Sequence, residues 1–168
     1  MHSLALKNSL LANAEKPADM GPVTCSRFLK FLNYDPEDGY WDDSVDSIKK
    51  FYEILSNYST RQREYLAFVI KRGKIEGSRW DERISIFPAE LERLLRISKL
   101  ESVEYFRVLE GDNLAWYDDD EPPAKLRLNA LENDLNFFVG LRRYCEKLVG
   151  EEKALEKIIV ECDFTLLD

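Results

Sequence analysis

The chain has 168 residues, including 32 Asp or Glu, 24 Lys or Arg and one His, so its formal net charge is −8. This length predicts one domain, and a content of 45% hydrophobic and 12% aromatic residues excludes an intrinsically disordered chain. No apolar run reaches the roughly 18 residues that a membrane-spanning helix needs, so we expect no membrane partner.

The scarcity of histidine and the spacing of cysteine exclude several kinds of enzyme. The single histidine, His2, follows Met1, so neither Ser-His-Asp nor Cys-His catalysis has a credible base. Cys25, Cys145 and Cys162 form no CxxC pair, which indicates reduced thiols and a cytoplasmic protein rather than a disulfide framework. Gly-rich phosphate motifs and zinc-ligand spacings do not occur in the sequence, so we expect no cofactor.

Residues 1–21 are predicted to be an N-terminal arm and linker, and residues 22–168 a single helical domain. Four leucines would share one side of a short amphipathic helix, with a loose arm as the alternative: Leu4, Leu6, Leu10 and Leu11. Lys7 interrupts the apolar stretch and no basic segment precedes it, so we expect no secretion signal. Pro and Gly over residues 16–22 predict the linker.

The first half of the domain shows apolar stripes with a helical period. They predict helices over residues 23–34, 44–58, 59–72 and 88–97, and an irregular connection over 74–85. Asp43 is expected to cap the second helix after an acidic loop at 35–43. Ser59 begins a capping box with Gln62, and Gly73 is expected to end that helix in the left-handed conformation.

The second half of the domain leaves one alternative open. Ser98 and Glu101 form another capping box that predicts a helix ending near Gly111, whereas a hairpin over 103–117 is the alternative. Residues 118–123 break regular structure, and a long helix capped by Asn129 is expected to run to Val149. A final helix over 151–160 would precede an alternating segment that permits a short C-terminal strand. The fold class is therefore a mainly α domain of five to seven helices.

The negative charge is concentrated in two short segments. Residues 35–46 contain six carboxylates and no Lys or Arg, and residues 110–121 have the same composition of charges. Together the two segments carry −12, which leaves +4 for the other 144 residues. Exposed carboxylates packed closely repel one another, so such a concentration costs stability and needs a compensating reason.

Each acidic segment also contains a Trp and a Tyr, which are residue types that anchor protein interfaces. The candidate partner-binding residues are Tyr40, Trp41, Asp42 and Asp43 in the first segment, and Trp116, Tyr117, Asp118, Asp119, Asp120 and Glu121 in the second. Solvated loops whose aromatics fold back onto the core are the alternative explanation. The spacing around Gly39 and Gly111 does not match a calcium-binding EF-hand loop, and the sequence leaves open whether the segments meet.

These features favour a small acidic cytoplasmic binding protein over an enzyme. It would neutralise or escort a basic protein partner, as a toxin-neutralising immunity protein or a nuclease inhibitor does. One alternative is a metal-dependent hydrolase in which Asp118, Asp119 and Asp120 bind Mg²⁺. Another is a helical regulatory module that forms a homodimer. Nucleic acid is not favoured as a partner, because the most basic stretch, residues 61–83, carries only +3.

Overall fold

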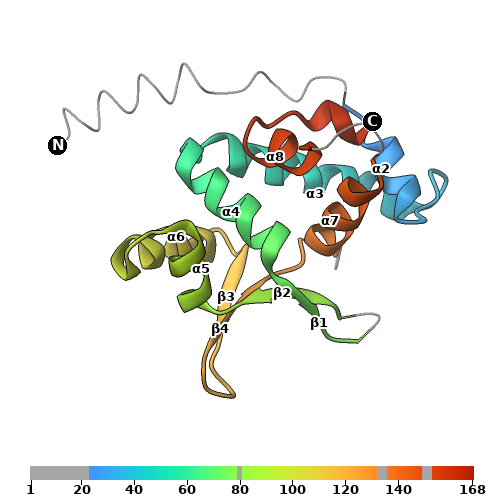
Figure 1. Ribbon diagram of the computed structural model, residues 1–168. Helices are drawn as coiled ribbons and strands as arrows, with labels where there is room; N and C mark the ends of the chain where they lie inside the picture. The colour runs from blue at the N-terminus through green and yellow to red at the C-terminus, as the bar shows by residue number, and fades with distance from the viewer. Residues whose placement is uncertain (1–22, 79–80, 132–135, 149–152) are drawn as a thin grey trace.

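The computed structural model describes residues 23–78, 81–131, 136–148 and 153–168 (Figure 1). The predicted arm and linker at 1–21 lie outside these residues. Seven α-helices and one four-stranded antiparallel sheet form the described part, with a helical content of 58%. The prediction of a mainly α domain with five to seven helices is confirmed, but the sheet shows that the fold is not purely helical.

The helices begin where the sequence supplies capping groups. Ser59 Oγ accepts the backbone N–H of Gln62 at 3.1 Å, and Ser98 Oγ accepts that of Glu101 at 3.0 Å. Both predicted capping boxes therefore lie at helix starts. The helices are α2 (Ser26–Phe31), α3 (Gly39–Ser56), α4 (Thr60–Arg72), α5 (Pro88–Leu95), α6 (Lys99–Gly111), α7 (Phe137–Lys147) and α8 (Ala154–Ile159), followed by the 3-10 helix η2 (Phe164–Leu167).

Two predicted helix starts are wrong. Helix α3 begins at Gly39 because Asp38 Oδ1, rather than Asp43, accepts a backbone N–H, that of Tyr40 at 3.2 Å. Residues 39–43 are therefore the first turn of a helix and not part of a loop. Helix α7 begins at Phe137, so Asn129 does not cap it. The intervening residues 132–135 lie outside the described part.

The four strands are short and pair in two hairpins. They are β1 (Lys74–Glu76), β2 (Arg83–Ile86), β3 (Ala115–Asp118) and β4 (Lys125–Leu128), in the order β1-β2-β4-β3. The predicted irregular connection at 74–85 is thus wrong. The alternative hairpin over 103–117 is also wrong, because residues 99–111 form α6 and β3 pairs with β4 instead.

The C-terminal segment does not form the permitted strand. Cys162 has a φ of 55°, which breaks the extended alternation, and Phe164–Leu167 form η2. Asp168 Oδ1 accepts the backbone N–H groups of Thr24 and Cys25 at 2.7 and 2.9 Å. The C-terminus is therefore fastened to the chain just before α2.

Gly73 joins α4 to β1, and its role differs from the prediction. Its φ of −64° and ψ of 159° are extended rather than left-handed. A Cβ at this position would lie 2.7 Å from the carbonyl oxygen of Val69 and would overlap the side chain of Ile84. Glycine is therefore required because β2 passes close to the end of α4.

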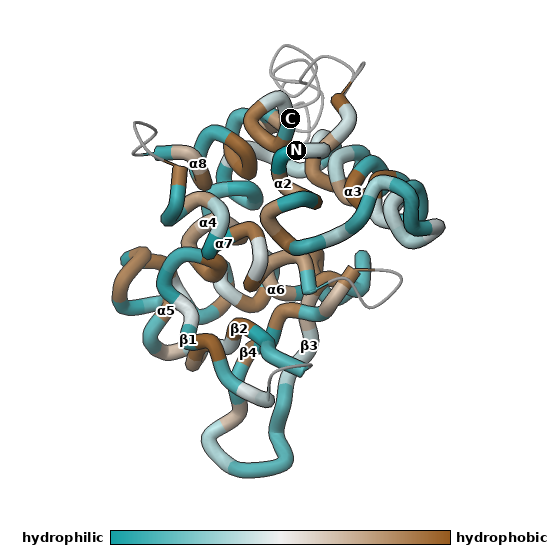
Figure 2. The backbone as a smooth tube through the Cα atoms, turned by 90° about the vertical axis from the view of Figure 1, so that its right-hand side faces the viewer, coloured by the Kyte–Doolittle hydropathy of each residue, from teal (hydrophilic) through white to brown (hydrophobic). Residues whose placement is uncertain are grey.

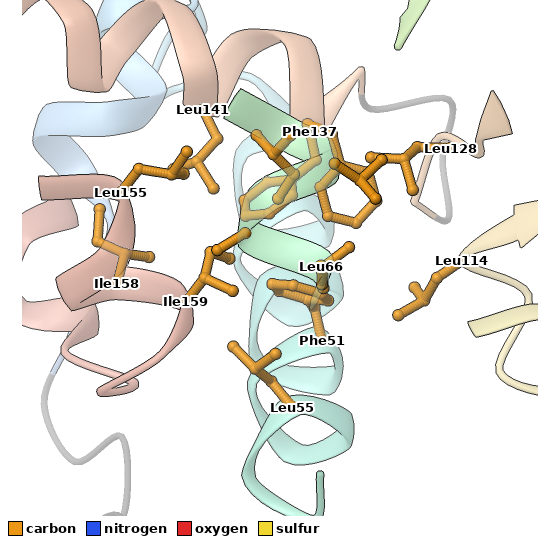
Figure 3. Close-up of a cluster of buried hydrophobic side chains, with 14 of the residues drawn as sticks. Phe51, Leu55, Leu66, Leu114, Leu128, Phe137, Leu141, Leu155, Ile158 and Ile159 are labelled. Atoms are coloured by element: carbon orange, nitrogen blue, oxygen red, sulfur yellow. The ribbon is translucent and has the colours of Figure 1, made fainter. Parts of the chain in front are cut away.

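The alternation of the strands separates a core face from a charged face. Pairs such as Ile75 with Ile84 and Ile86 with Leu126 place apolar side chains on the face that contacts α4, α6 and α7. The other face carries charged side chains and Trp116. In Figure 3, side chains of α3, α4, α7 and α8 converge around Phe51 and Phe137, and strands of the sheet lie to the right of this core. The ring centroids of Phe51 and Phe137 are 5.0 Å apart.

Candidate protein-binding surfaces

The first acidic segment forms an exposed surface at the start of α3. We call it the α3 surface; it consists of Asp35, Glu37, Asp38, Tyr40, Asp42, Asp43 and Asp46, all exposed. Tyr40 is 67% exposed, which is high for an aromatic side chain. Among the described residues, none of these carboxylates forms an ion pair. The negative charge of this surface is therefore uncompensated.

Several residues of the α3 surface also stabilise the local backbone. Asp38 caps α3, and Asp35 Oδ1 accepts the backbone N–H of Glu37 at 3.0 Å. Asp42 lies in the first turn, where a carboxylate interacts favourably with the helix dipole. Trp41 is only partly exposed and packs against the core. Its aromatic ring therefore fastens the start of α3 and does not project toward a partner.

Residues 115–121 of the second acidic segment lie on the hairpin formed by β3 and β4, whereas Glu110 and Asp112 lie at the end of α6. We call the exposed side of this hairpin the hairpin surface. It consists of Phe87, Trp116, Asp118, Asp119, Asp120 and Glu121. Because side chains alternate along β3, Trp116 lies on the charged face and is 42% exposed. Tyr117 points the other way and stacks on Phe106 with 3.8 Å between ring centroids. Phe87, which follows β2, is 38% exposed.

A network of ion pairs beneath the hairpin surface connects all four strands. Arg127 Nε donates to Asp118 Oδ2 at 2.6 Å, and Lys125 Nζ lies 3.2 Å from both carboxylate oxygens of Glu76. The Arg127 guanidinium also lies 3.8 Å from Glu76. The hydroxyl of Ser85 donates to Glu76 and is buried below it. Strands β1, β2, β4 and β3 each contribute at least one group.

The network changes the electrostatics of its carboxylates. The hydrogen bond from Ser85, together with Lys125, lowers the pKa of Glu76 below the ordinary carboxyl range. The hydrogen bond from Arg127 lowers the pKa of Asp118 in the same way. Both carboxylates are therefore held ionised, and the cations beside them are already neutralised. The ion-pair network that supports the hairpin surface therefore has no large net charge.

The turn between β3 and β4 leaves its other acids free. Asp119, Asp120 and Glu121 are exposed and form no ion pair with any residue that the structure describes. A pocket of about 520 Å³ opens between this turn and Phe87. The Nζ of Lys125 lies 5.5 Å from the centroid of the Phe87 ring. The hairpin surface thus combines two exposed aromatics, a pocket and a rim of free carboxylates.

The two surfaces do not meet. In Figure 1 the turn between β3 and β4 is the lowest point of the molecule, whereas the blue segment that leads into α3 lies at the upper right. Figure 2, viewed at 90° to this, also shows the turn at the bottom and α3 near the top. Trp41 and Trp116 therefore belong to separate surfaces, and Trp80 lies outside the described residues.

Of the ten residues predicted from sequence to bind a partner, seven are exposed and three point inward or are paired. The three are Trp41, Tyr117 and Asp118. Sequence reasoning missed the supporting group formed by Glu76, Ser85, Lys125 and Arg127. Its signal was the alternation of polar and apolar residues over 74–76, 83–86 and 125–128, which is typical of strands with one buried face.

The described residues offer neither a cluster of metal ligands nor a helix that could span a membrane. That part of the chain contains no group of three His, Cys, Asp or Glu side chains placed to hold a metal ion. Asp118 uses its two oxygens to accept from Arg127 and from the backbone N–H of Asp120. Over the same residues, no helix has the length and apolar content to cross a bilayer.

The comparisons with known proteins identify no relative. The chain matches no family model, and neither the search of curated proteins nor the search of solved structures found a match. The geometry of the two surfaces is therefore the basis for assigning a function.

Proposed function

We propose that this protein binds a basic protein and neutralises or escorts it by covering a cationic site of that partner, with the hairpin surface as the contact. One observation carries this proposal: Trp116 is exposed on a hairpin whose turn carries three free carboxylates, and an ion-pair network holds the strands of that hairpin in place. A toxin or nuclease with a cationic active site is the partner class that this chemistry fits. All three cysteines are free thiols, so we place the binding in the cytoplasm.

The composition of the hairpin surface resembles that of the centre of a protein–protein interface, with aromatic residues surrounded by charged ones. Binding energy concentrates in a few aromatic anchors that become desolvated, while surrounding polar residues exclude water. Trp116 and Phe87 would be such anchors, and the carboxylates of the turn would pair with Lys or Arg of the partner. The pocket of about 520 Å³ can receive one long basic side chain beside Asp120 and Glu121. Because the ion-pair network already holds the supporting strands in place, little conformational entropy is lost when the partner binds.

The α3 surface contributes to the same function from a distance. Its six carboxylates form no ion pair with any described residue, so they produce a negative potential around this end of the molecule. Such a field accelerates encounter with a cationic protein and weakens as salt is added. Its exposed aromatic is Tyr40 alone, whereas the hairpin surface holds Trp116 and Phe87 and has a pocket beside Phe87. We therefore assign steering to the α3 surface and contact to the hairpin surface.

The two alternative functions draw less support from the structure. The apolar stripe of α3, which a helical homodimer would need, is used inside the domain, since Ile48, Phe51 and Leu55 are buried. The hydrolase alternative needs Asp118, Asp119 and Asp120 to converge on one ion. Asp118 instead pairs with Arg127, and the other two side chains lie on the turn.

A matched pair of triple variants tests the proposal. D119N/D120N/E121Q and D42N/D43N/D46N each remove three negative charges, so the two proteins have the same net charge. Each is used with the wild type to capture proteins from a lysate of the organism that encodes the chain. We expect the wild type and the α3 variant to retain a protein rich in Lys and Arg, and the hairpin variant to lose it. Equal retention by both variants, or retention of no basic protein by the wild type, contradicts the proposal.

A further inference from the structure

A pocket of about 570 Å³ lies between α3 and one end of the sheet. One wall is a face of α3 on which Ser47, Lys50, Phe51 and Ile54 recur at intervals of three and four residues. The other wall consists of the segments that lead into β3 and out of β4, together with Arg83 at the start of β2. Sites for small molecules usually enclose roughly 300–1,000 Å³, so the pocket has the size of such a site.

The register of the strands explains why these segments meet. The backbone N–H of Asn129 donates to the carbonyl oxygen of Leu114 at 2.9 Å, so the pairing of β4 with β3 continues past the ends of both strands. On the other side of β4, Ser85 pairs with Arg127, and the same antiparallel register, continued by two residues, places Arg83 opposite Asn129. Leu114, Asn129 and Arg83 therefore lie in one row at the end of the sheet that faces α3.

Hydrogen bonds hold the wall opposite α3 in place. Asn129 Nδ2 donates to the backbone carbonyl of Asn113 at 2.8 Å, and the hydroxyl of the buried Tyr58 donates to Asp112 Oδ2 at 2.7 Å. Tyr58 lies just after α3, so the second bond ties the loop after α6 to the end of that helix. Because these bonds form within the chain itself, little conformational entropy is lost when a ligand enters the pocket.

The pocket also has an apolar floor. Phe51 and Leu114 are buried, and Ile54 and Leu131 pack against the core with part of their surface exposed. In Figure 3, Leu114 extends from the strands toward Phe51 of α3. A ligand that lies between the two walls would therefore cover carbon atoms, which favours a molecule with an apolar body.

The charged groups of the pocket favour an anion. Among the described residues that line it are two cations, Arg83 and Lys50, and one carboxylate, that of Asp112. The Arg83 guanidinium pairs with Asp81 at 3.1 Å, and its Nη1 donates to the backbone carbonyl of Glu82. The Asp81 side chain is 75% exposed, and a pair with a well-solvated partner contributes little free energy. An anionic ligand can therefore replace Asp81 at low cost.

We infer that this pocket binds a small organic anion whose carboxylate or phosphate group pairs with Arg83 and whose apolar body packs against Phe51 and Leu114. The guanidinium of an arginine presents parallel N–H donors that match two oxygens of either group. The side-chain amides of Asn113 and Asn129 line the same wall and supply further hydrogen-bonding groups. None of the described lining residues belongs to the hairpin surface, so the inference is independent of the proposed function.

Four probes that share a benzene ring and differ in charge test the inference: phenyl phosphate, benzoate, benzyl alcohol and benzylamine. Each is added to the full wild-type chain while backbone amide signals are followed by NMR. We expect the anions to shift the signals of residues 112–114 and 129–131, with dissociation constants of about 5 mM or tighter. Benzyl alcohol and benzylamine should bind at least about tenfold more weakly, because neither can pair with a guanidinium. Binding of only one of the two anions would identify the recognised group as phosphate or as carboxylate.

A matched pair of variants tests the role of Arg83. Arg83→Gln removes the cation from the pocket, and Arg93→Gln removes the same charge from an exposed position on α5. We expect R83Q to weaken anion binding by about tenfold or more, and R93Q to leave it unchanged. The dispersed amide signals of each free variant show whether it is folded, and the comparison of the four probes on the wild type needs no variant.

Three results would overturn the inference. The first is equal binding of benzyl alcohol and the anions, which would indicate a pocket that selects only for apolar surface. The second is unchanged anion affinity in a folded R83Q variant. The third is the absence of shifts at residues 112–114 and 129–131 when both anions reach about 20 mM, a concentration severalfold above the expected dissociation constants.

Discussion

Residues 35–46 and residues 110–121 carry the same charge in the same length of chain, yet the fold gives them different surroundings. In the first, the helical start of α3 exposes every carboxylate and turns Trp41 toward the core. In the second, strand alternation turns Asp118 toward Arg127 and leaves Trp116 exposed. Composition therefore identifies a concentration of charge, but backbone geometry decides which aromatic side chain can serve as an anchor.

The two regions also differ in what compensates their charge. The carboxylates of the hairpin are balanced in part by Lys125 and Arg127, whereas those of the α3 surface form no ion pair with any described residue. The hairpin surface is thus better suited to a close contact, in which unpaired charge would cost free energy on desolvation. The α3 surface is better suited to long-range attraction, for which solvated charges suffice.

The largest expected effect is on the affinity for the basic partner, and it should differ between variants of Trp116 and of Tyr40. Replacing Trp116 by alanine should weaken binding of the captured basic partner by at least about 30-fold, which corresponds to about 2 kcal/mol for a central anchor. Replacing Tyr40 by alanine should weaken it by less than about 3-fold. Isothermal titration calorimetry measures both. If Y40A loses more affinity than W116A, the roles of the two surfaces are reversed.

The next effect is on stability, and it follows from breaking the ion-pair network beneath the hairpin surface. Arg127→Met should lower the urea midpoint of unfolding, because Asp118 loses its ion-pair partner and Glu76 keeps only Lys125. Urea denaturation measures this shift. In a double-mutant cycle with Asp118→Asn, the two changes should be less than additive. Strict additivity would mean that the pair does not fasten β3 to β4.

A smaller effect is expected at the start of α3. Asp38→Ala should cost about 1 kcal/mol of stability, because the backbone N–H of Tyr40 loses its capping acceptor. Asp46→Ala, which removes an exposed charge farther along the helix, serves as the control and should change stability by less than about 0.5 kcal/mol. Thermal unfolding compares the two. Equal losses would show that capping is not the local role of this segment.

The smallest effect is in the pH dependence of stability. The pKa of Glu76 is lower in the folded protein than in the unfolded chain, so its contribution is present above about pH 4.3 and is lost as pH falls through the folded value. The unfolded state then binds the additional proton. Glu76→Gln should therefore flatten the decline in unfolding free energy below about pH 4.5, as measured by urea titrations at several pH values. An unchanged decline would contradict the role assigned to Ser85 and Lys125.

The helical part of the fold could be predicted because its signals are local. Ser59 and Ser98 each place a hydroxyl three residues before the N–H that it accepts, and the apolar stripe of α3 is visible over four turns. The start of α3 could not be placed, because both Asp38 and Asp43 are suitable caps. Tertiary packing rather than local preference decides between them.

The sheet could not be predicted because its strands have only three or four residues and its two hairpins pair with each other across α5 and α6. Strands β2 and β4 are adjacent in the sheet but 42 positions apart at Ser85 and Arg127. The same separation explains why the ion-pair network was missed, since Glu76 and Lys125 meet only after the hairpins are docked. The acidic and aromatic residues of the surfaces were found from composition. Their division into two surfaces required the fold.

The most direct measurement is the footprint of the basic partner on this protein. Backbone amide signals are assigned for the full chain and followed by NMR while the captured partner is added. We expect the signals of residues 85–87 and 115–121 to shift or broaden first and most, with only small changes over residues 35–46. A footprint centred on residues 35–46, with the signals of the hairpin unchanged, would contradict the claim that the hairpin surface is the contact.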